Sequence, residues 1–269
     1  MAEETRQRRR ARERELLKQG RGFARRGMPE RPPREQMLAL ALTLRGKLEE
    51  EGNRTRAGEC AEFAHSTFEA SLKAQPLRTK LACRKGCSYC CHSYVSVTAP
   101  EAFLLGAAIA TAHKRLPASA TAALLARCER TAGHTPAERF GKKLPCPLLV
   151  DGACSAYAAR PFMCRQVTSF AVEPCIEEYE GREGEISVSS RHLAHAANAQ
   201  VAMLAAVAAC GRPPVSYELS AALTAVLATP DAQARWLEGE DVFAGVAVAP
   251  PSPAPLRDLV DALAREASP

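Results

Sequence analysis

Aromatic residues are scarce in this sequence. They make up 5% of its 269 residues, and tryptophan occurs once. Alanine is abundant instead, and alanine favours helix whereas strands favour aromatic and β-branched side chains. We therefore expect a mainly α protein. The length is enough to bury a sizeable core, either as one large domain or as a domain with appendages.

Long apolar runs are also missing. The longest runs, such as VAMLAAVAAC at residues 201–210, fall well short of the ~20 residues that cross a bilayer. The stretch MAEETRQRRRARERELLKQG is charged throughout, which argues against a secretory signal, and its glutamates argue against a mitochondrial transit peptide. We therefore expect a cytoplasmic protein without a transmembrane segment. In that compartment thiols stay reduced, so clustered cysteines indicate metal binding or catalysis rather than disulfides.

Charge is unevenly distributed along the chain. Residues 1–34 hold twelve Arg or Lys and five Glu, a net charge of +7, whereas the whole chain carries +6. Because residues 26–35 contain three prolines, we expect 1–34 to be a basic, disordered arm. The run QRRRARER could attract nucleic acid or an acidic membrane, but it lacks interleaved aromatics for base stacking. A solubilising or protein-docking role is therefore at least as favoured, and the protein partner is unknown. Six glutamates at 173–185 are expected to form a solvated loop.

Apolar periodicity predicts helices on both sides of a central region that has no sustained period. The predicted helices cover about 35–50, 55–74, 99–113, 118–132, 190–210, 215–228, 231–238 and 255–267. A short strand is predicted at 95–98, and Thr98 and Glu101 then form a capping box at the start of a helix. Residues 133–187 lack periodicity, so we expect loops and short helices that are ordered by something other than a core.

Cysteine is the residue that is plentiful. Eleven are present, and an odd number fits a disulfide framework poorly. Cys60, Cys128 and Cys210 stand alone on predicted helices, where we expect them to be core residues. The other eight lie in CRKGCSYCCH at 83–92 and in CPLLVDGACSAYAARPFMCRQVTSFAVEPC at 146–175. These candidate metal ligands are Cys83, Cys87, Cys90, Cys91, Cys146, Cys154, Cys164 and Cys175.

Clustered thiolates are soft ligands, and four in a tetrahedral arrangement select zinc or an iron–sulfur cluster. A helix or a tight turn at 83–91 would bring the sulfurs together, and Gly86 before Cys87 favours a turn whose amides point at sulfur. Neighbouring side chains diverge, so Cys90 and Cys91 are poorly placed to hold one ion together. We expect them to serve different metals or different irons of one cluster. The sequence therefore predicts one binuclear region or two neighbouring sites, with more than one metal atom.

These motifs resemble the YkgJ-type cysteine-cluster family, which is described as a zinc- or iron-chelating CxxCxxCC domain. The resemblance covers about residues 80–180 and rests on CRKGCSYCC, the cysteine pattern of 146–157, RPFMCR at 160–165 and a trailing Cys175. The first spacing here is C-x3-C rather than C-x2-C. The resemblance implies a bound iron–sulfur or zinc cluster. A related region in flagellin lysine N-methylases implies that some relatives modify proteins, although this chain has no obvious Gly-rich S-adenosylmethionine loop.

The predicted fold is therefore mainly α, with an irregular cysteine-rich metal-cluster domain embedded in a helical body. The predicted regions are a basic arm at 1–34, N-terminal helices at 35–79, a cysteine-cluster domain at 80–185, a helical part at 186–245, and a Pro-rich linker with a terminal helix at 246–269.

Two functions follow from this pattern. The first is a metal-cluster-binding protein with a structural, sensory or electron-transfer role. The alternative is a cluster-dependent enzyme that modifies a protein or a small molecule. Iron–sulfur is favoured over zinc, because Cys146-Pro147 resembles the step that ends bacterial ferredoxin runs. The catalytic residues are unknown, and the candidates for outer contacts to metal or substrate are His92, Glu101, Arg160 and Arg165.

Overall fold

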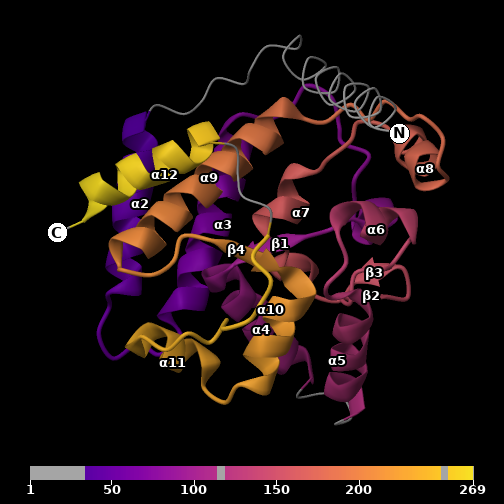
Figure 1. Ribbon diagram of the computed structural model, residues 1–269. Coiled ribbons are helices and arrows are strands. Elements are labelled where there is room, and N and C mark those ends of the chain that lie inside the picture. The colour runs from indigo at the N-terminus through magenta and orange to yellow at the C-terminus, as the bar shows by residue number, and fades with distance from the viewer. Residues whose placement is uncertain (1–33, 114–118, 250–253, 269) are drawn as a thin grey trace, which may run out of the picture. The chain divides into compact units, whose positions relative to one another are not determined.

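The computed structural model of the protein describes most of the chain (Figure 1). The described residues are 34–113, 119–249 and 254–268. Contacts within the chain divide it into two units, residues 1–31 and 32–269, and the described residues all belong to the second. The predicted basic arm at 1–34 lies outside the described residues apart from Arg34, as do residues 250–253 of the predicted linker.

Helices dominate the described residues, as the composition predicted. They are α2 (Arg34–Leu48), α3 (Arg56–Ala74), α4 (Ala99–His113), α5 (Ser119–Thr131), α6 (Pro136–Gly141), α7 (Phe162–Gln166), α8 (Glu173–Tyr179), α9 (Ser190–Ala209), α10 (Leu219–Ala228), α11 (Ala232–Glu238) and α12 (Ala254–Ala267). Two 3₁₀ helices are η1 (Tyr89–His92) and η2 (Tyr157–Ala159). The strands are β1 (Ser96–Thr98), β2 (Leu149–Val150), β3 (Ala153–Cys154) and β4 (Ser216–Glu218). Most helices begin and end close to the positions that periodicity predicted.

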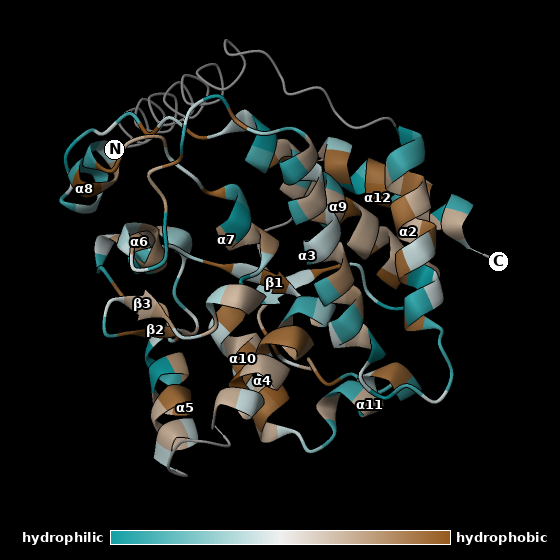
Figure 2. Ribbon diagram, turned by 180° about the vertical axis from the view of Figure 1, so that it is seen from behind, coloured by the Kyte–Doolittle hydropathy of each residue, from teal (hydrophilic) through white to brown (hydrophobic). Residues whose placement is uncertain are grey.

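Helix α9 is the centre of the helical body, and it packs against α2, α3, α7 and α12 (Figure 1). Its buried face is rich in alanine, including Ala199, Ala202 and Ala206. Small side chains let neighbouring helices approach closely, so alanine here builds the core without aromatic bulk. A second pair, α4 and α10, is apolar over most of its length (Figure 2). Both groups of helices belong to one continuous hydrophobic core.

Residues 216–218 form strand β4, so the prediction of a helix from 215 was wrong at this end. β4 pairs with β1 in antiparallel register, with Ser96 opposite Glu218. The ring of Tyr217 stacks on Phe243, with centroids 4.4 Å apart. These partners come from distant parts of the chain, and such tertiary contacts override local helix propensity. The helix begins at Leu219 instead, where the Glu218 carboxylate accepts a hydrogen bond from the amide of Ala221 at 2.8 Å.

The region at 133–187 consists of loops and short elements, as predicted. It contains α6, the β2–β3 hairpin, η2, α7 and α8. The hairpin turns through Asp151 and Gly152, which both have positive φ. Positive φ at both central residues is typical of a type I′ turn, whose twist matches the right-handed twist of the two paired strands. The cysteines of this region therefore lie on separate short elements, so each can take its own orientation.

Buried Glu101 joins the helices α3, α4 and α7. Its side chain accepts hydrogen bonds from the amide and hydroxyl of Thr98, both at 3.0 Å, as the capping box predicted. It also accepts one from the amide of Phe162 at 2.7 Å, and it lies 3.4 Å from Nε2 of His65 on α3. Phe162 begins α7, which carries Cys164. Glu101 thus ties a cysteine-bearing helix to the helical body.

The environment of Glu101 keeps its carboxylate ionised. Burial alone would raise its pKa, but the hydrogen bond and charge of His65, together with the amides of Thr98 and Phe162, lower the pKa below its ordinary value. The residue is fully buried. A buried carboxylate is stable only when its hydrogen bonds and its charge are satisfied, so each of these partners depends on the others.

We expect Glu101→Ala to lower the free energy of unfolding by about 3 kcal/mol, because it leaves buried donors without an acceptor. Denaturant unfolding of both proteins measures the loss. Since the folded pKa of Glu101 is lowered, its contribution is present above the unfolded value of about 4.3 and disappears as pH falls through the folded pKa. The difference between the two proteins should therefore shrink in acid.

Glu138 provides a matched control, because it forms the same capping box with Thr135 at the start of α6, on an exposed surface. We expect Glu138→Ala to lower stability much less. Equal losses for the two variants would mean that Glu101 acts only as a cap.

Candidate metal centre

The stretch CRKGCSYCCH forms a turn followed by one short helix. The amide of Cys87 donates to the carbonyl of Arg84 at 3.0 Å, and Gly86 has φ +92°, a left-handed conformation that glycine adopts without strain. Helix η1 then carries Cys90 and Cys91. Of the two geometries expected from the sequence, the structure therefore has the tight turn.

Backbone hydrogen bonds join this stretch to the second set of cysteines. The amide of Cys146 donates to the carbonyl of Cys91 at 2.7 Å. The amide of Ala82 donates to the carbonyl of Ser169 at 2.9 Å, and the amide of Ser169 donates to the sulfur of Cys83 at 3.2 Å. Helix α8, which carries Cys175, packs on η1. Segments distant in sequence are thus held together around the cysteines.

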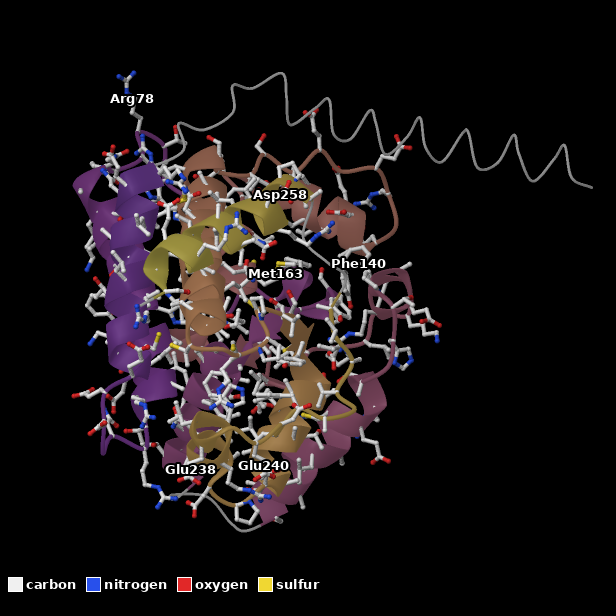
Figure 3. The ribbon with its side chains drawn as sticks, turned by 60° about the vertical axis from the view of Figure 1, so that its left-hand side comes forward. Arg78, Phe140, Met163, Glu238, Glu240 and Asp258 are labelled. Atoms are coloured by element: carbon white, nitrogen blue, oxygen red, sulfur yellow. The ribbon has the colours of Figure 1, made fainter. Side chains whose placement is uncertain are left out.

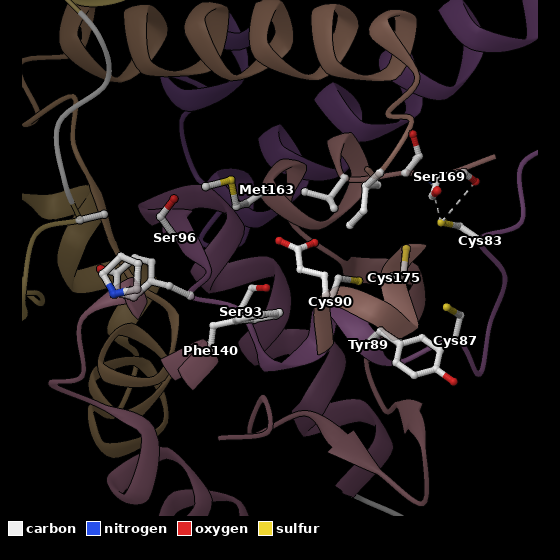
Figure 4. Close-up of a pocket in the computed structure, with 17 residues that line it drawn as sticks. Cys83, Cys87, Tyr89, Cys90, Ser93, Ser96, Phe140, Met163, Ser169 and Cys175 are labelled. Carbon is white, nitrogen blue, oxygen red and sulfur yellow. Dashed lines mark hydrogen bonds between the residues drawn. The ribbon is translucent and has the colours of Figure 1, made fainter. Parts of the chain in front are cut away.

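The eight cysteines line two adjoining cavities. The smaller has a volume of about 140 Å³, and every one of the eight except Cys175 lines it. The larger has a volume of about 570 Å³ and extends to Phe140 and Met163, which Figure 3 labels. Figure 4 shows the four cysteines of the larger cavity grouped at one end of it. They are Cys83, Cys87, Cys90 and Cys175, and the first three line both cavities.

The thiols form two groups that meet at Cys90. One group is Cys83, Cys87 and Cys175, and the other is Cys146, Cys154 and Cys164. Cys90 influences members of both groups electrostatically. A hydrogen bond with Cys91 and then burial raise the pKa of the Cys90 thiol. The adjacent pair therefore lines the smaller cavity together, and Cys90 is the member that interacts with both groups.

Backbone amides face several of the sulfurs in a repeated pattern. The amide two residues further along the chain lowers the pKa of Cys87, Cys146 and Cys154 by hydrogen bonding. These donors are Tyr89, Leu148 and Ala156, respectively. Amides that donate to sulfur favour the thiolate over the thiol. The sequence predicted amides that point at sulfur only for the turn at Gly86. The structure has this arrangement at three cysteines.

Burial acts in the opposite direction. It raises the pKa of Cys146 to about 12, even though the amide of Leu148 opposes the shift, and it raises the pKa of Cys164 well above its ordinary value. Burial therefore favours the protonated form of these two thiols. Among the described residues, no three His, Cys, Asp or Glu side chains are grouped so that they could hold one metal ion. The sulfurs thus surround the cavities without meeting at a common point.

Two arginines supply positive charge to the smaller cavity, Arg84 and Arg160. The guanidinium of Arg160 stacks over the Tyr157 ring, with its carbon 3.7 Å from the ring centroid, and it lowers the pKa of Cys90, Cys154 and Cys164. Positive charge at this position offsets the charge of clustered thiolates.

The other three candidates for outer contacts lie elsewhere. Arg165 is buried and binds Glu69 at 2.6 Å and the carbonyl of Arg160 at 2.6 Å, so it fixes the loop. His92 places Nδ1 3.3 Å from the carbonyl of Tyr89, and its ring lies 4.8 Å from that of Tyr179. Neither His92 nor Arg165 nor Glu101 lines the two cavities.

The three lone cysteines lie apart from the cavities. Cys60 is fully buried, its thiol donates to the carbonyl of Leu44 at 3.7 Å, and burial raises its pKa to about 12. Burial likewise raises the pKa of Cys128 and of Cys210 to about 11. Cys60 and Cys128 belong to the hydrophobic core and Cys210 packs against it.

Sequence reasoning missed several residues of this region. Ser169 holds Cys83 through its backbone, and Tyr94, Phe140 and Met163 form cavity walls. No local motif marks them, because each is brought in by tertiary packing.

Comparisons with protein-family models, with curated proteins and with solved structures found no match for this chain. Among the described helices, none is both long and apolar enough to cross a bilayer. The class defined by fold and site is a mainly α-helical protein with two adjoining cysteine-lined cavities.

We expect a thiol reagent to separate core from cavity cysteines. In metal-free folded protein, iodoacetamide should alkylate Cys83 and Cys87 well before Cys60 and Cys128, because the last two are fully buried. Peptide mass spectrometry over a time course gives each rate, and denatured protein should label at every cysteine. If Cys60 reacts as fast as Cys87 under native conditions, the division is wrong.

Proposed function

We propose that this protein binds a polynuclear metal group through its clustered cysteines, with iron–sulfur favoured over zinc. The role of the group would be structural, sensory or electron-transferring. The observation that carries the proposal is that seven thiols from four chain segments line one small cavity of about 140 Å³. In a reducing cytoplasm, where we place the protein, thiols do not pair as disulfides, so cysteines clustered this densely favour metal binding.

The donor set suits a thiolate-bound group. The residues that would hold it are the seven cysteines of the smaller cavity, with Cys175 beside them. Amides at Cys87, Cys146 and Cys154 favour thiolates, and Arg160 offsets their charge. An iron–sulfur group would supply electron transfer or a Lewis-acidic iron, whereas zinc would supply a Lewis acid without redox activity. Because ligands must lose their protons and move inward, binding is coupled to the ordering of this region.

The position of Cys90 and Cys91 supports a shared group over two separate ions. Both line the smaller cavity, and Cys91 interacts directly with Cys90. Two adjacent ligands bind different metal atoms most readily when those atoms belong to one cluster. The number of available thiols exceeds the four that a single ion takes.

A cluster-dependent enzyme is the second candidate, and the larger cavity is the observation that favours it. This cavity contains four of the same cysteines, so it would give a substrate access to the metal group. Catalytic metal sites keep an open position, whereas structural sites are closed. The substrate would be a protein or a small molecule.

Anaerobic purification should yield protein with at least one metal ion per chain. We expect iron with acid-labile sulfide and a brown colour, because the thiol-rich site suits a polynuclear group. Metal analysis, sulfide analysis and a visible spectrum measure this. A colourless protein with stoichiometric zinc would overturn the preference for iron, and less than one metal ion per chain would overturn the proposal.

Serine substitutions should locate the ligands. Cys146→Ser, Cys154→Ser and Cys164→Ser should each lower the bound metal severalfold, because a serine hydroxyl is a poor soft ligand. Cys210→Ser is the matched control, since Cys210 lies outside both cavities, and its metal content should be unchanged. Circular dichroism verifies that each variant is folded. Metal loss in the control alone would contradict the ligand assignment.

A further inference from the structure

The larger of the two cavities has more space than a metal site requires. The smaller, at about 140 Å³, is suited to an inorganic group enclosed by sulfur. The larger, at about 570 Å³, falls in the range of roughly 300–1,000 Å³ that is typical of small organic ligands. The space beyond Cys83, Cys87 and Cys90 is therefore large enough for a molecule in addition to a metal group.

The wall of the larger cavity is mainly apolar, with a few hydroxyl groups. Its side chains include Phe140, Met163 and Ile186. Ser96 is only 8% exposed, and it lies in this wall. Figure 4 shows Ser93 and Ser96 lining this cavity. Hydroxyl groups on an apolar wall can bond the polar part of a ligand.

The charged side chain that lines the larger cavity is acidic. Glu178 is the one carboxylate among the described residues that line the larger cavity, and no Lys, Arg or His lines it. The smaller cavity, by contrast, has Arg84 and Arg160 in its wall. An anionic ligand would thus meet repulsion here, whereas a cation would meet attraction.

Aromatic rings add to this preference. Tyr89, Tyr94 and Phe140 all line the larger cavity, although aromatic residues are only 5% of the sequence. The face of an aromatic ring attracts a cation within about 6 Å of its centre. The apolar wall, the aromatic side chains and Glu178 together suit a ligand with a cationic head and an aliphatic body.

We propose that the larger cavity is a binding site for a small amphipathic cation of the alkylammonium class. Its head would lie among Glu178, the aromatic rings and the sulfur end, and its aliphatic body would pack on Met163 and Ile186. The inference goes beyond the proposed function and is argued from the cavity and its lining. The cavity, its rings and Glu178 are independent of bound metal.

Three probes with the same chain length and different head groups test the site. Hexylammonium, hexan-1-ol and hexanoate are added to the full-length protein as purified, and binding is followed by saturation-transfer NMR. We expect hexylammonium to bind in the millimolar range, as is usual for a ligand of about seven heavy atoms, and at least threefold more tightly than hexanoate. No binding by hexylammonium, or equal binding of hexylammonium and hexanoate, overturns the proposal.

Matched variants connect binding to this cavity. Ile186→Trp fills the cavity and should abolish hexylammonium binding, whereas Leu42→Trp adds the same ring on an exposed face of α2 and should leave it unchanged. Glu178→Gln changes an exposed side chain, keeps its shape, and should reduce the preference for hexylammonium over hexan-1-ol at least twofold. Unchanged binding in either cavity variant overturns the assignment.

Metal content, measured in the same samples, separates the two proposals. Protein with stoichiometric metal and no hexylammonium binding retains the proposed function and refutes the cation site. Protein that contains no metal but binds hexylammonium in the wild type, and not in Ile186→Trp, retains the cation site and refutes the metal proposal.

Discussion

The hydrogen bonds of Glu101 are the interaction on which the position of the cysteine region depends. One buried carboxylate accepts from Thr98 at the start of α4 and from Phe162 at the start of α7, and it lies beside His65 of α3. Desolvation opposes a charge at this position, so the carboxylate is stable only while these partners are in place. Cys164 follows Phe162 by two residues and therefore inherits its position from the helical body.

Opposing effects on the thiols explain how the region could respond to a metal. Burial raises the pKa of Cys146 and Cys164, whereas backbone amides and Arg160 lower the pKa of the thiols that they face. Burial favours the neutral thiol, whereas the amides and Arg160 favour the thiolate. A bound cation replaces the protons and compensates for desolvation, and the amides are already directed at sulfur. Loops without a core of their own can be ordered in this way.

Local signals in the sequence predicted local structure well. Periodicity predicted the long helices, the spacing of Thr98 and Glu101 predicted the cap, and Gly86 predicted the turn. Contacts between distant segments could not be predicted. The amide of Phe162, which is 61 residues from Glu101, has no marker in the sequence, and β4 was missed because its partner strand is β1. Nor does any spacing indicate that the cysteines line two cavities rather than one.

The division into two cavities also sets how charge is arranged around the sulfurs. Arg84 and Arg160 lie on the side of the smaller cavity, and Glu178 lies on the side of the larger one. Cys83, Cys87 and Cys90 line both cavities, and the charges of Arg84 and Arg160 lower the pKa of Cys87 and Cys90, respectively. A cation bound in the larger cavity would add positive charge beside these shared cysteines. The shared cysteines would thus link what occupies one cavity to the charge that the other can hold.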